Sequence, residues 1–280
     1  MGRPRKRRTV EDYEKLLADG FGIGEKEHYR PWIRIPDFAS HGVSAAIPGI
    51  TIKRIHEVLS GIETRAFLLA EFNRSVIDIR EQFPLFPVDH LIALAERAGI
   101  VYPYISGTPY VLTTDLLLTM EVEGKISYVA VAVKPTEALR KKSVLDNLEL
   151  ERLWWNSLGI QWVLATEIDL PEVLGDNLTW ISHEFRESEF DYDSVDIQRL
   201  KSLSSEIESR TYLVGDLICL IAQELNVDTI EAKLMLCKAI WQHLLVIDLN
   251  VSIQKDGMIK ILTWNFSDAD YREPSYENIA

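Results

Sequence analysis

Residues 113–135 read TTDLLLTMEVEGKISYVAVAVKP, and the fold follows from this stretch because two apolar, strand-like runs flank a short turn. Two charged residues, Asp115 and Lys134, stand within these runs. Burying an unpaired charge is costly, so strands that hide their side chains normally exclude both residue types. The pattern therefore predicts that the fold brings the two charges to one place.

A β-hairpin explains how they meet. Strands are expected at about Val111 to Met120 and Ile126 to Lys134, joined by a turn at the EGK sequence. If the turn centres just after Gly124, Asp115 lies directly opposite Lys134. Directly opposed residues of antiparallel strands have Cβ atoms about 5 Å apart on one face. The two charges are then expected to share one site.

The segments that follow the hairpin predict the rest of the sheet. Residues 137–157, which contain LELERLWW, are expected to form a helix, and LGIQWVLAT at 158–166 gives a further apolar strand. The order of hairpin, helix and strand predicts an α/β fold, a mixed sheet with flanking helices. Glu149 and Glu151 are interpreted first as surface charges of this helix, with contact between Glu151 and the site as the alternative.

A second helix is indicated by SGIETRAFLLAEF, which starts at Ser60. Ser60 is a suitable N-cap, and Glu63 falls three residues later, where a capping box places a glutamate that bonds back to the backbone N–H of the cap. Capping alone explains Glu63, and a catalytic role remains the open alternative.

Composition describes a soluble globular protein of 280 residues, long enough for two domains, with 47% hydrophobic residues. There is no apolar leader segment and no uncharged run long enough for a membrane span, so a cytoplasmic protein is expected. Cys219 and Cys237 lie in apolar helical patterns and are interpreted as core thiols.

Charge is unevenly distributed although the net charge is −13. Residues 1–54 hold 11 Lys and Arg against 7 Asp and Glu, whereas residues 170–280 hold 9 against 20. This asymmetry indicates that the N-terminal part meets phosphate and the C-terminal part meets protein.

The first eight residues, MGRPRKRR, form a basic tail without apolar content, expected to be disordered when free. The candidate DNA contacts are Arg3, Arg5, Lys6, Arg7 and Arg8. The Gly-Arg-Pro core resembles an AT-hook, which inserts arginines into a narrow minor groove. A solubilising tail that touches phosphates without sequence preference is the other interpretation.

The composition changes near Pro171, where an acidic linker is expected, followed by two helical patterns at 211–226 and 228–245. Apolar and polar residues alternate from Ile247 to Gln254, and a KDG turn leads into the strand MIKILTW. Helices followed by a two-stranded wing predict a small winged-helix domain over residues 171–280, built for protein contacts because its wing carries few positive charges.

Several enzyme classes are disfavoured because the sequence has neither an HExxH pairing for zinc nor a GxSxG elbow for a serine nucleophile. Hydrolysis of a phosphodiester needs Mg²⁺ held by carboxylates and a cation near the attacked phosphate. Glu63, Asp115 and Lys134 are residues of the required types. Structural ion pairs have the same appearance, so from the residues alone both interpretations stay open.

Four stretches resemble the TnsA endonuclease family of target-selecting bacterial transposons. They are LSGIETRAFLLAEFNRSVIDIREQFPL, GIVYPYISGTPYVLTTDLLL, AVAVKP and LELERLWW, and the similarity runs from about Gly20 to Thr166. The resemblance implies that residues 9–170 form a restriction-endonuclease-like catalytic domain that depends on Mg²⁺, with Mn²⁺ as a substitute. It also implies cleavage of the 5′ strands at the transposon ends, with a DDE-type transposase, TnsB, and an ATPase, TnsC, as partners.

Carried over by position, the family's catalytic residues fall on Glu63, Asp115 and Lys134, and its metal ligands on Glu63, Asp115 and the carbonyl of Val133. One position departs from the family: Ala132 stands where a Glu or Gln is usual, which leaves open how many Mg²⁺ ions bind. Because of Ala132, an inert nuclease fold attached to a winged-helix binding module remains an alternative. A stand-alone restriction nuclease is a third.

Overall fold

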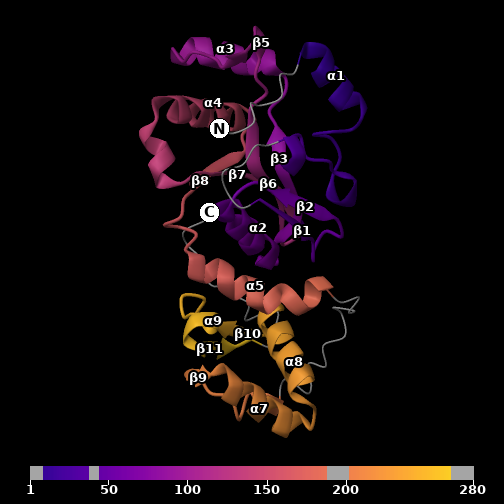
Figure 1. Cartoon of the computed structure of the whole chain (residues 1–280), viewed down its shortest axis with the longest axis vertical. Helices are drawn as coiled ribbons and strands as arrows, with labels where there is room; N and C mark the ends of the chain where they lie inside the picture. The colour runs from indigo at the N-terminus through magenta and orange to yellow at the C-terminus, as the bar shows by residue number, and fades with distance from the viewer. Residues whose placement is uncertain (1–8, 38–43, 188–201, 266–280) are drawn as a thin grey trace. The chain divides into compact units, whose positions relative to one another are not determined.

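The computed structural model describes residues 9–37, 44–187 and 202–265 of the chain. The chain divides into two compact units, the first ending at Leu170 and the second running from Pro171 to Asn278. Figure 1 labels the helices and strands of both units. The five basic tail residues expected to contact DNA, at positions 3 and 5–8, lie outside the described residues.

The first unit contains fifteen of the elements labelled in chain order. They are α1 (Val10–Ala18), η1 (Lys26–His28), η2 (Ile35–Asp37), β1 (Ala45–Pro48), β2 (Ile55–Val58), α2 (Gly61–Phe72), β3 (Val76–Pro84), α3 (Val88–Ala98), β4 (Tyr104–Ile105), β5 (Thr108–Pro109), β6 (Thr113–Val122), β7 (Lys125–Val133), η3 (Thr136–Arg140), α4 (Lys142–Ser157) and β8 (Gln161–Ala165).

A four-stranded mixed sheet forms the centre of this unit, in the order β3-β6-β7-β8. β6 is antiparallel to both β3 and β7, and β8 is parallel to β7. Parallel neighbours need a crossover connection, which α4 supplies between β7 and β8. The expected α/β class, a mixed sheet with flanking helices, is confirmed.

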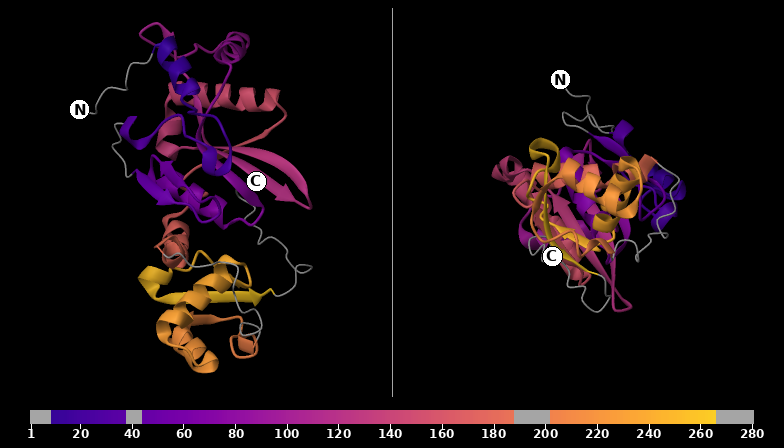
Figure 2. Two further views of the ribbon diagram at one scale, coloured as in Figure 1. Left: turned by 90° about the vertical axis from the view of Figure 1, so that its right-hand side faces the viewer. Right: turned by 90° about the horizontal axis from the view of Figure 1, so that it is seen from below.

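The hairpin register differs from the expected one by two residues. Val122 pairs with Lys125, so the turn consists of Glu123 and Gly124, which both have positive φ angles, 50° and 73°. A two-residue turn of this kind matches the right-handed twist of the strands. The turn end of the β6–β7 hairpin extends beyond the rest of the sheet (Figure 2). Because side chains alternate with a period of two, the shift leaves Asp115 and Lys134 on the same side.

Helices cover the sheet. α2 packs against β3, β6 and β7. On the side of α3 and α4, a shared core joins the helices to the sheet, and its fully buried members include Leu85, Leu91, Ala130, Leu150 and Trp155. The exclusion of this apolar surface from water is the main favourable term that holds the strands in place.

The glycine-rich segment before β1 packs against β3. The side chains of Tyr29 and Trp32 are buried, and the backbone N–H of Gly22 donates to the carbonyl of Arg30. Gly22 has a φ of 71°, and a Cβ there would lie 2.4 Å from a ring carbon of Pro84. Glycine is required at this position because the chain passes so close to the strand.

The second unit contains α5 (Glu172–Glu187), β9 (Thr211–Leu213), α7 (Val214–Leu225), α8 (Thr229–Trp241), β10 (Leu245–Ile247), α9 (Ile253–Asp256) and β11 (Met258–Trp264). Its strands form a three-stranded antiparallel sheet in the order β10-β11-β9. The acidic linker expected directly after Pro171 is incorrect, because α5 begins there.

The long strand expected from Ile247 to Gln254 is also incorrect. β10 ends at Ile247, and the carboxylate of Asp248 accepts a hydrogen bond from the backbone N–H of Asn250 at 3.0 Å, which turns the chain. Ser252 then caps α9 by accepting from the N–H of Lys255 at 3.0 Å. Short polar side chains thus bond to the local backbone, which competes with a strand ladder.

Two further expectations concern the burial of the cysteines and the absence of membrane spans. Cys237 is buried as expected, but Cys219 is exposed, so only one of the two cysteines is a core thiol. In the parts of the chain that the structure describes, none of the helices has the length and hydropathy needed to span a membrane.

Candidate active site

Asp115 stands where β6 and β7 begin to separate. The last pair of their ladder is Leu116 with Val131. Beyond it, the backbone N–H of Val133 donates to Oδ2 of Asp115 at 2.7 Å, so a side-chain carboxylate takes the place of a backbone acceptor. This hydrogen bond fixes the carboxylate, which is only 7% exposed, at the end of the two strands.

Lys134 completes an ion pair with the same oxygen. Its Nζ lies 2.6 Å from Oδ2 of Asp115 and donates to the carbonyl of Val133 at 2.9 Å. Burial alone would lower the pKa of Lys134, but the negative charges of Asp115 and Glu151 outweigh it and raise the pKa. The ammonium is therefore charged, and its side chain is 32% exposed.

Glu63 lies in the first turn of α2. Ser60 caps the helix, and its Oγ accepts from the backbone N–H of Glu63 at 3.2 Å. The Glu63 carboxylate does not bond to the backbone N–H of Ser60, as a capping box requires. It accepts instead from the backbone N–H of Leu59 at 3.0 Å and from Oγ of Ser60 at 2.9 Å. Capping therefore explains only part of this side chain's position.

The amide of Gln82, on β3, joins the two acids. Its Nε2 lies 3.3 Å from Oε2 of Glu63 and 3.3 Å from Oδ1 of Asp115. Burial, together with the charge of Asp115, raises the pKa of Glu63 to about 7. The structure thus brings Glu63, Asp115, Val133 and Lys134 together, as expected from the sequence, and adds Gln82, which the sequence reasoning did not select.

Glu151 is a buried acid beside this group and not the surface charge first expected. It is 5% exposed, and its Oε1 accepts from Oγ1 of Thr114 at 2.8 Å. The indole N–H of Trp155 donates to the same hydroxyl at 2.6 Å. Burial and the charge of Asp115 raise the pKa of Glu151 to about 7. Glu149, by contrast, lies on the helix surface and pairs with Arg152.

Ala132 is completely buried, and it pairs with Leu164 of β8. Its methyl group contributes no polar atom to the cluster. At the position where the family usually has Glu or Gln, this chain therefore supplies packing alone.

The donor set suits a hard divalent cation. Glu63 and Asp115 are two carboxylates held by one amide, and the ammonium of Lys134 links Asp115 to the Val133 carbonyl. A cation between the acids would offset the repulsion and burial that raise the pKa of Glu63. In the described part of the chain no group of three or more His, Cys, Asp or Glu side chains is arranged to hold a metal. Mg²⁺ is commonly held by one or two carboxylates and keeps several waters, so two carboxylates and a backbone carbonyl are donors of the kind it takes.

Part of the chain is similar to known proteins. Residues 73–167 match the family described as TnsA-like endonuclease N terminal. The chain is also 36% identical, over 167 residues, to the Escherichia coli protein "Transposon Tn7 transposition protein TnsA". This similarity covers 60% of this chain and 60% of the length of that relative. The first unit therefore contains a segment, residues 73–167, that is similar to the N-terminal domain of TnsA-like endonucleases.

Proposed function

We propose that this protein is the Mg²⁺-dependent endodeoxyribonuclease subunit of a transposase and cuts the 5′ strands at transposon ends. The observation that carries the proposal is the cluster in which Lys134 pairs with Asp115 while one amide links Asp115 to Glu63. Similarity to a Tn7 transposition protein supports a role in transposition.

Each residue has a stated role. Glu63, Asp115 and the carbonyl of Val133 would hold Mg²⁺, which supplies an activated water and stabilises charge on the phosphate. Lys134 carries three N–H donors, and two of them reach Asp115 and Val133. The third is then available to a phosphate oxygen, where a fixed positive charge favours the transition state.

The finer fold assignments belong to the proposal. A restriction-endonuclease-like domain is supported by a mixed sheet with Asp115 and Lys134 at the end of adjacent strands and Glu63 at the start of α2. A winged-helix assignment for the second unit is supported by the succession of α7 and α8 and by the pairing of β10 with β11.

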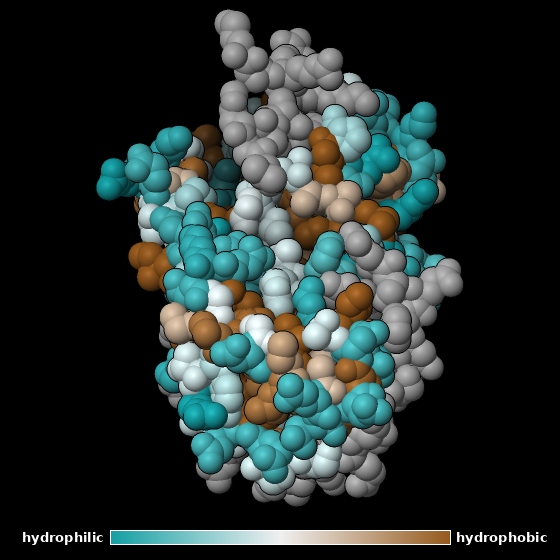
Figure 3. All heavy atoms as spheres, turned by 60° about the horizontal axis from the view of Figure 1, so that its bottom comes forward, coloured by the Kyte–Doolittle hydropathy of each residue, from teal (hydrophilic) through white to brown (hydrophobic). Residues whose placement is uncertain are grey.

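Partners are proposed from the family likeness and from the second unit's surface. That unit is acidic, which disfavours phosphate, and it exposes apolar side chains such as Leu213 and Ile230. Hydrophobic residues are visible among hydrophilic ones in the view of Figure 3. We therefore place contacts with an ATPase, TnsC, on the second unit, and expect a DDE-type transposase, TnsB, to act beside the first.

Strand-resolved cleavage of a labelled transposon-end duplex tests the proposal, with the partner transposase present and with Mg²⁺ or EDTA. The expected result is 5′-strand nicking that needs both this protein and Mg²⁺. Absence of 5′ nicking at every Mg²⁺ concentration would favour the alternative of an inert nuclease fold that serves as a binding module.

A further inference from the structure

Gln82 lies inside β3 in a conformation that its residue type rarely adopts. Its φ is 49°, in the left-handed region, and its side chain is almost completely buried, with 3% exposed. A left-handed conformation is unfavourable for a residue other than glycine, and it persists only where the surroundings enforce it. Such residues gather at functional sites, so the reason for this one should be found in its contacts.

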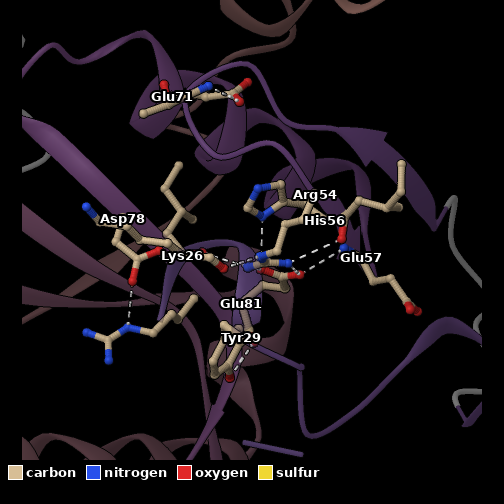
Figure 4. Close-up of polar contacts among 12 residues, drawn as sticks. Lys26, Tyr29, Arg54, His56, Glu57, Glu71, Asp78 and Glu81 are labelled. Carbon is tan, nitrogen blue, oxygen red and sulfur yellow. Dashed lines mark hydrogen bonds and ion pairs between the residues drawn. The ribbon is translucent and has the colours of Figure 1, made fainter. Parts of the chain in front are cut away.

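The preceding residue anchors the strand. The carboxylate of Glu81 accepts two hydrogen bonds from Arg54, at 2.5 and 2.6 Å, one from Nδ1 of His56 at 3.0 Å and one from the backbone N–H of Glu57 at 3.1 Å (Figure 4). Glu81 is 1% exposed, and a bidentate pair with arginine fixes direction as well as distance. This network ties β3 to the β1–β2 hairpin immediately before Gln82.

Backbone contacts complete the anchorage. The hydroxyl of Tyr29 donates to the carbonyl of Glu81 at 3.0 Å, and the backbone N–H of Trp32 donates to the carbonyl of Gln82 at 3.3 Å. Both aromatic side chains are buried. The unusual turn of the backbone at Gln82 is thus held from the segment before β1.

The orientation of the Gln82 amide is also set. Oγ1 of Thr113 donates to Oε1 of Gln82 at 3.1 Å. The other end of the amide, Nε2, is therefore the end that faces Glu63 and Asp115. An amide N–H₂ has two donors, which matches two carboxylate acceptors.

We propose that Gln82 is a positioning residue that holds Glu63 and Asp115 at the spacing a divalent cation requires. The inference rests on the proposed nuclease function and extends it, since it assigns to β3 the amide that Ala132 does not supply from β7. Partners that orient carboxylate ligands of this kind typically change metal affinity about 10- to 100-fold when they are removed.

The test measures Mn²⁺ binding to the full-length protein by isothermal titration calorimetry at pH 8. Gln82→Met keeps the length of the side chain and removes its hydrogen bonds, and it is expected to weaken the Kd for Mn²⁺ about 10-fold or more. Gln82→Glu adds a negative charge beside the same two acids and is expected to tighten binding. Gln161→Met, at an exposed position of β8, is the matched control and should leave the Kd unchanged.

A merely structural role would not give opposite effects for the Met and Glu variants. Equal weakening by both variants, an unchanged Kd for Gln82→Met, or no Mn²⁺ binding by the natural protein would overturn the inference. Thermal unfolding checks that each variant folds. If Gln82→Met does not fold, Thr113→Val replaces it, since it leaves Gln82 in place and removes the bond that orients the amide.

The two proposals fail separately. If Gln82→Met weakens Mn²⁺ binding while the natural protein cuts no DNA, the positioning role stands and the nuclease function is wrong. If the natural protein cuts DNA and Gln82→Met binds Mn²⁺ normally, only the positioning role is wrong. In a cleavage assay the inferred role predicts a higher Mn²⁺ requirement for Gln82→Met, with a rate at saturating Mn²⁺ close to that of the natural protein.

Discussion

The ammonium of Lys134 lies 2.6 Å from Oδ2 of Asp115. Lys134 directly follows β7, and Asp115 lies on the neighbouring strand β6, beyond the last pair of their ladder. The separation of the strands leaves the carboxylate accessible to a side chain and to the backbone N–H of Val133. A lysine in this position neutralises one acid while its partly exposed end remains within reach of a ligand from solvent.

Glu81→Gln is expected to remove a pH-dependent contribution to stability. Burial alone would raise the pKa of Glu81, but hydrogen bonds from Arg54 and His56 outweigh it and lower the pKa to about 2. A glutamate in the unfolded chain has a pKa of ~4.3. The stabilisation is therefore complete above that value and is lost as the pH falls toward 2.

The measurement is the free energy of unfolding in urea, followed by tryptophan fluorescence at pH 6 and at pH 3. The natural protein should exceed Glu81→Gln by about 3 kcal/mol at pH 6 and by roughly half of that at pH 3. The raised pKa values of Glu63 and Glu151 affect both proteins alike, so they cancel in the comparison. A gap that did not narrow on acidification would show that Glu81 stabilises through packing alone.

Thr114→Val should destabilise the first unit by about 1–3 kcal/mol, because it leaves two buried polar groups without their partner. The hydroxyl that this substitution removes donates to Glu151 and accepts from the indole of Trp155. Thr114→Ser keeps the hydroxyl and is the control, expected to lose much less. Chemical unfolding of both variants decides the matter, and equal losses would trace the effect to the methyl group.

The basic tail is expected to carry much of the salt-dependent affinity for naked duplex DNA. The slope of log K against log salt falls by ~0.9 for each phosphate that is no longer neutralised, so replacing five basic residues lowers it by up to about 4.5. The variant replaces Arg3, Arg5, Lys6, Arg7 and Arg8 with serine, and Lys255→Ser in the second unit is the control. Fluorescence anisotropy of labelled duplex DNA at several salt concentrations measures the slope. An unchanged slope would place the DNA contacts elsewhere.

Some of the candidate site was predictable because it depends on local pattern. The apolar runs around the EGK turn place Asp115 and Lys134 in one hairpin. A register error of two residues still leaves both side chains on the same face of the sheet. The start of α2 at Ser60 likewise follows from capping chemistry that neighbouring residues supply.

The rest depends on contacts that no local pattern specifies. Gln82 is one glutamine in a strand, and its left-handed backbone and its two carboxylate partners arise from residues distant in sequence. The burial of Glu151 also depends on residues distant in sequence. In LELERLWW the glutamates alternate with leucines, a pattern that is equally compatible with glutamates on the helix surface. In the second unit, the alternation after Ile247 resembles that of a strand. The strand ends there because Asp248 accepts a hydrogen bond from the backbone N–H of Asn250 and Ser252 caps α9.

The central claim is that Asp115 belongs to a nuclease site, and one reaction tests it most directly. A transposon-end duplex labelled on each strand is incubated with the partner transposase, Mg²⁺ and either the natural protein, Asp115→Asn or the control Gln161→Met. We expect Asp115→Asn to lower 5′-strand cleavage by about 100-fold or more, as loss of a group that stabilises the transition state does, while 3′-strand cleavage by the partner continues. Undiminished 5′-strand cleavage by Asp115→Asn in that mixture would contradict the account.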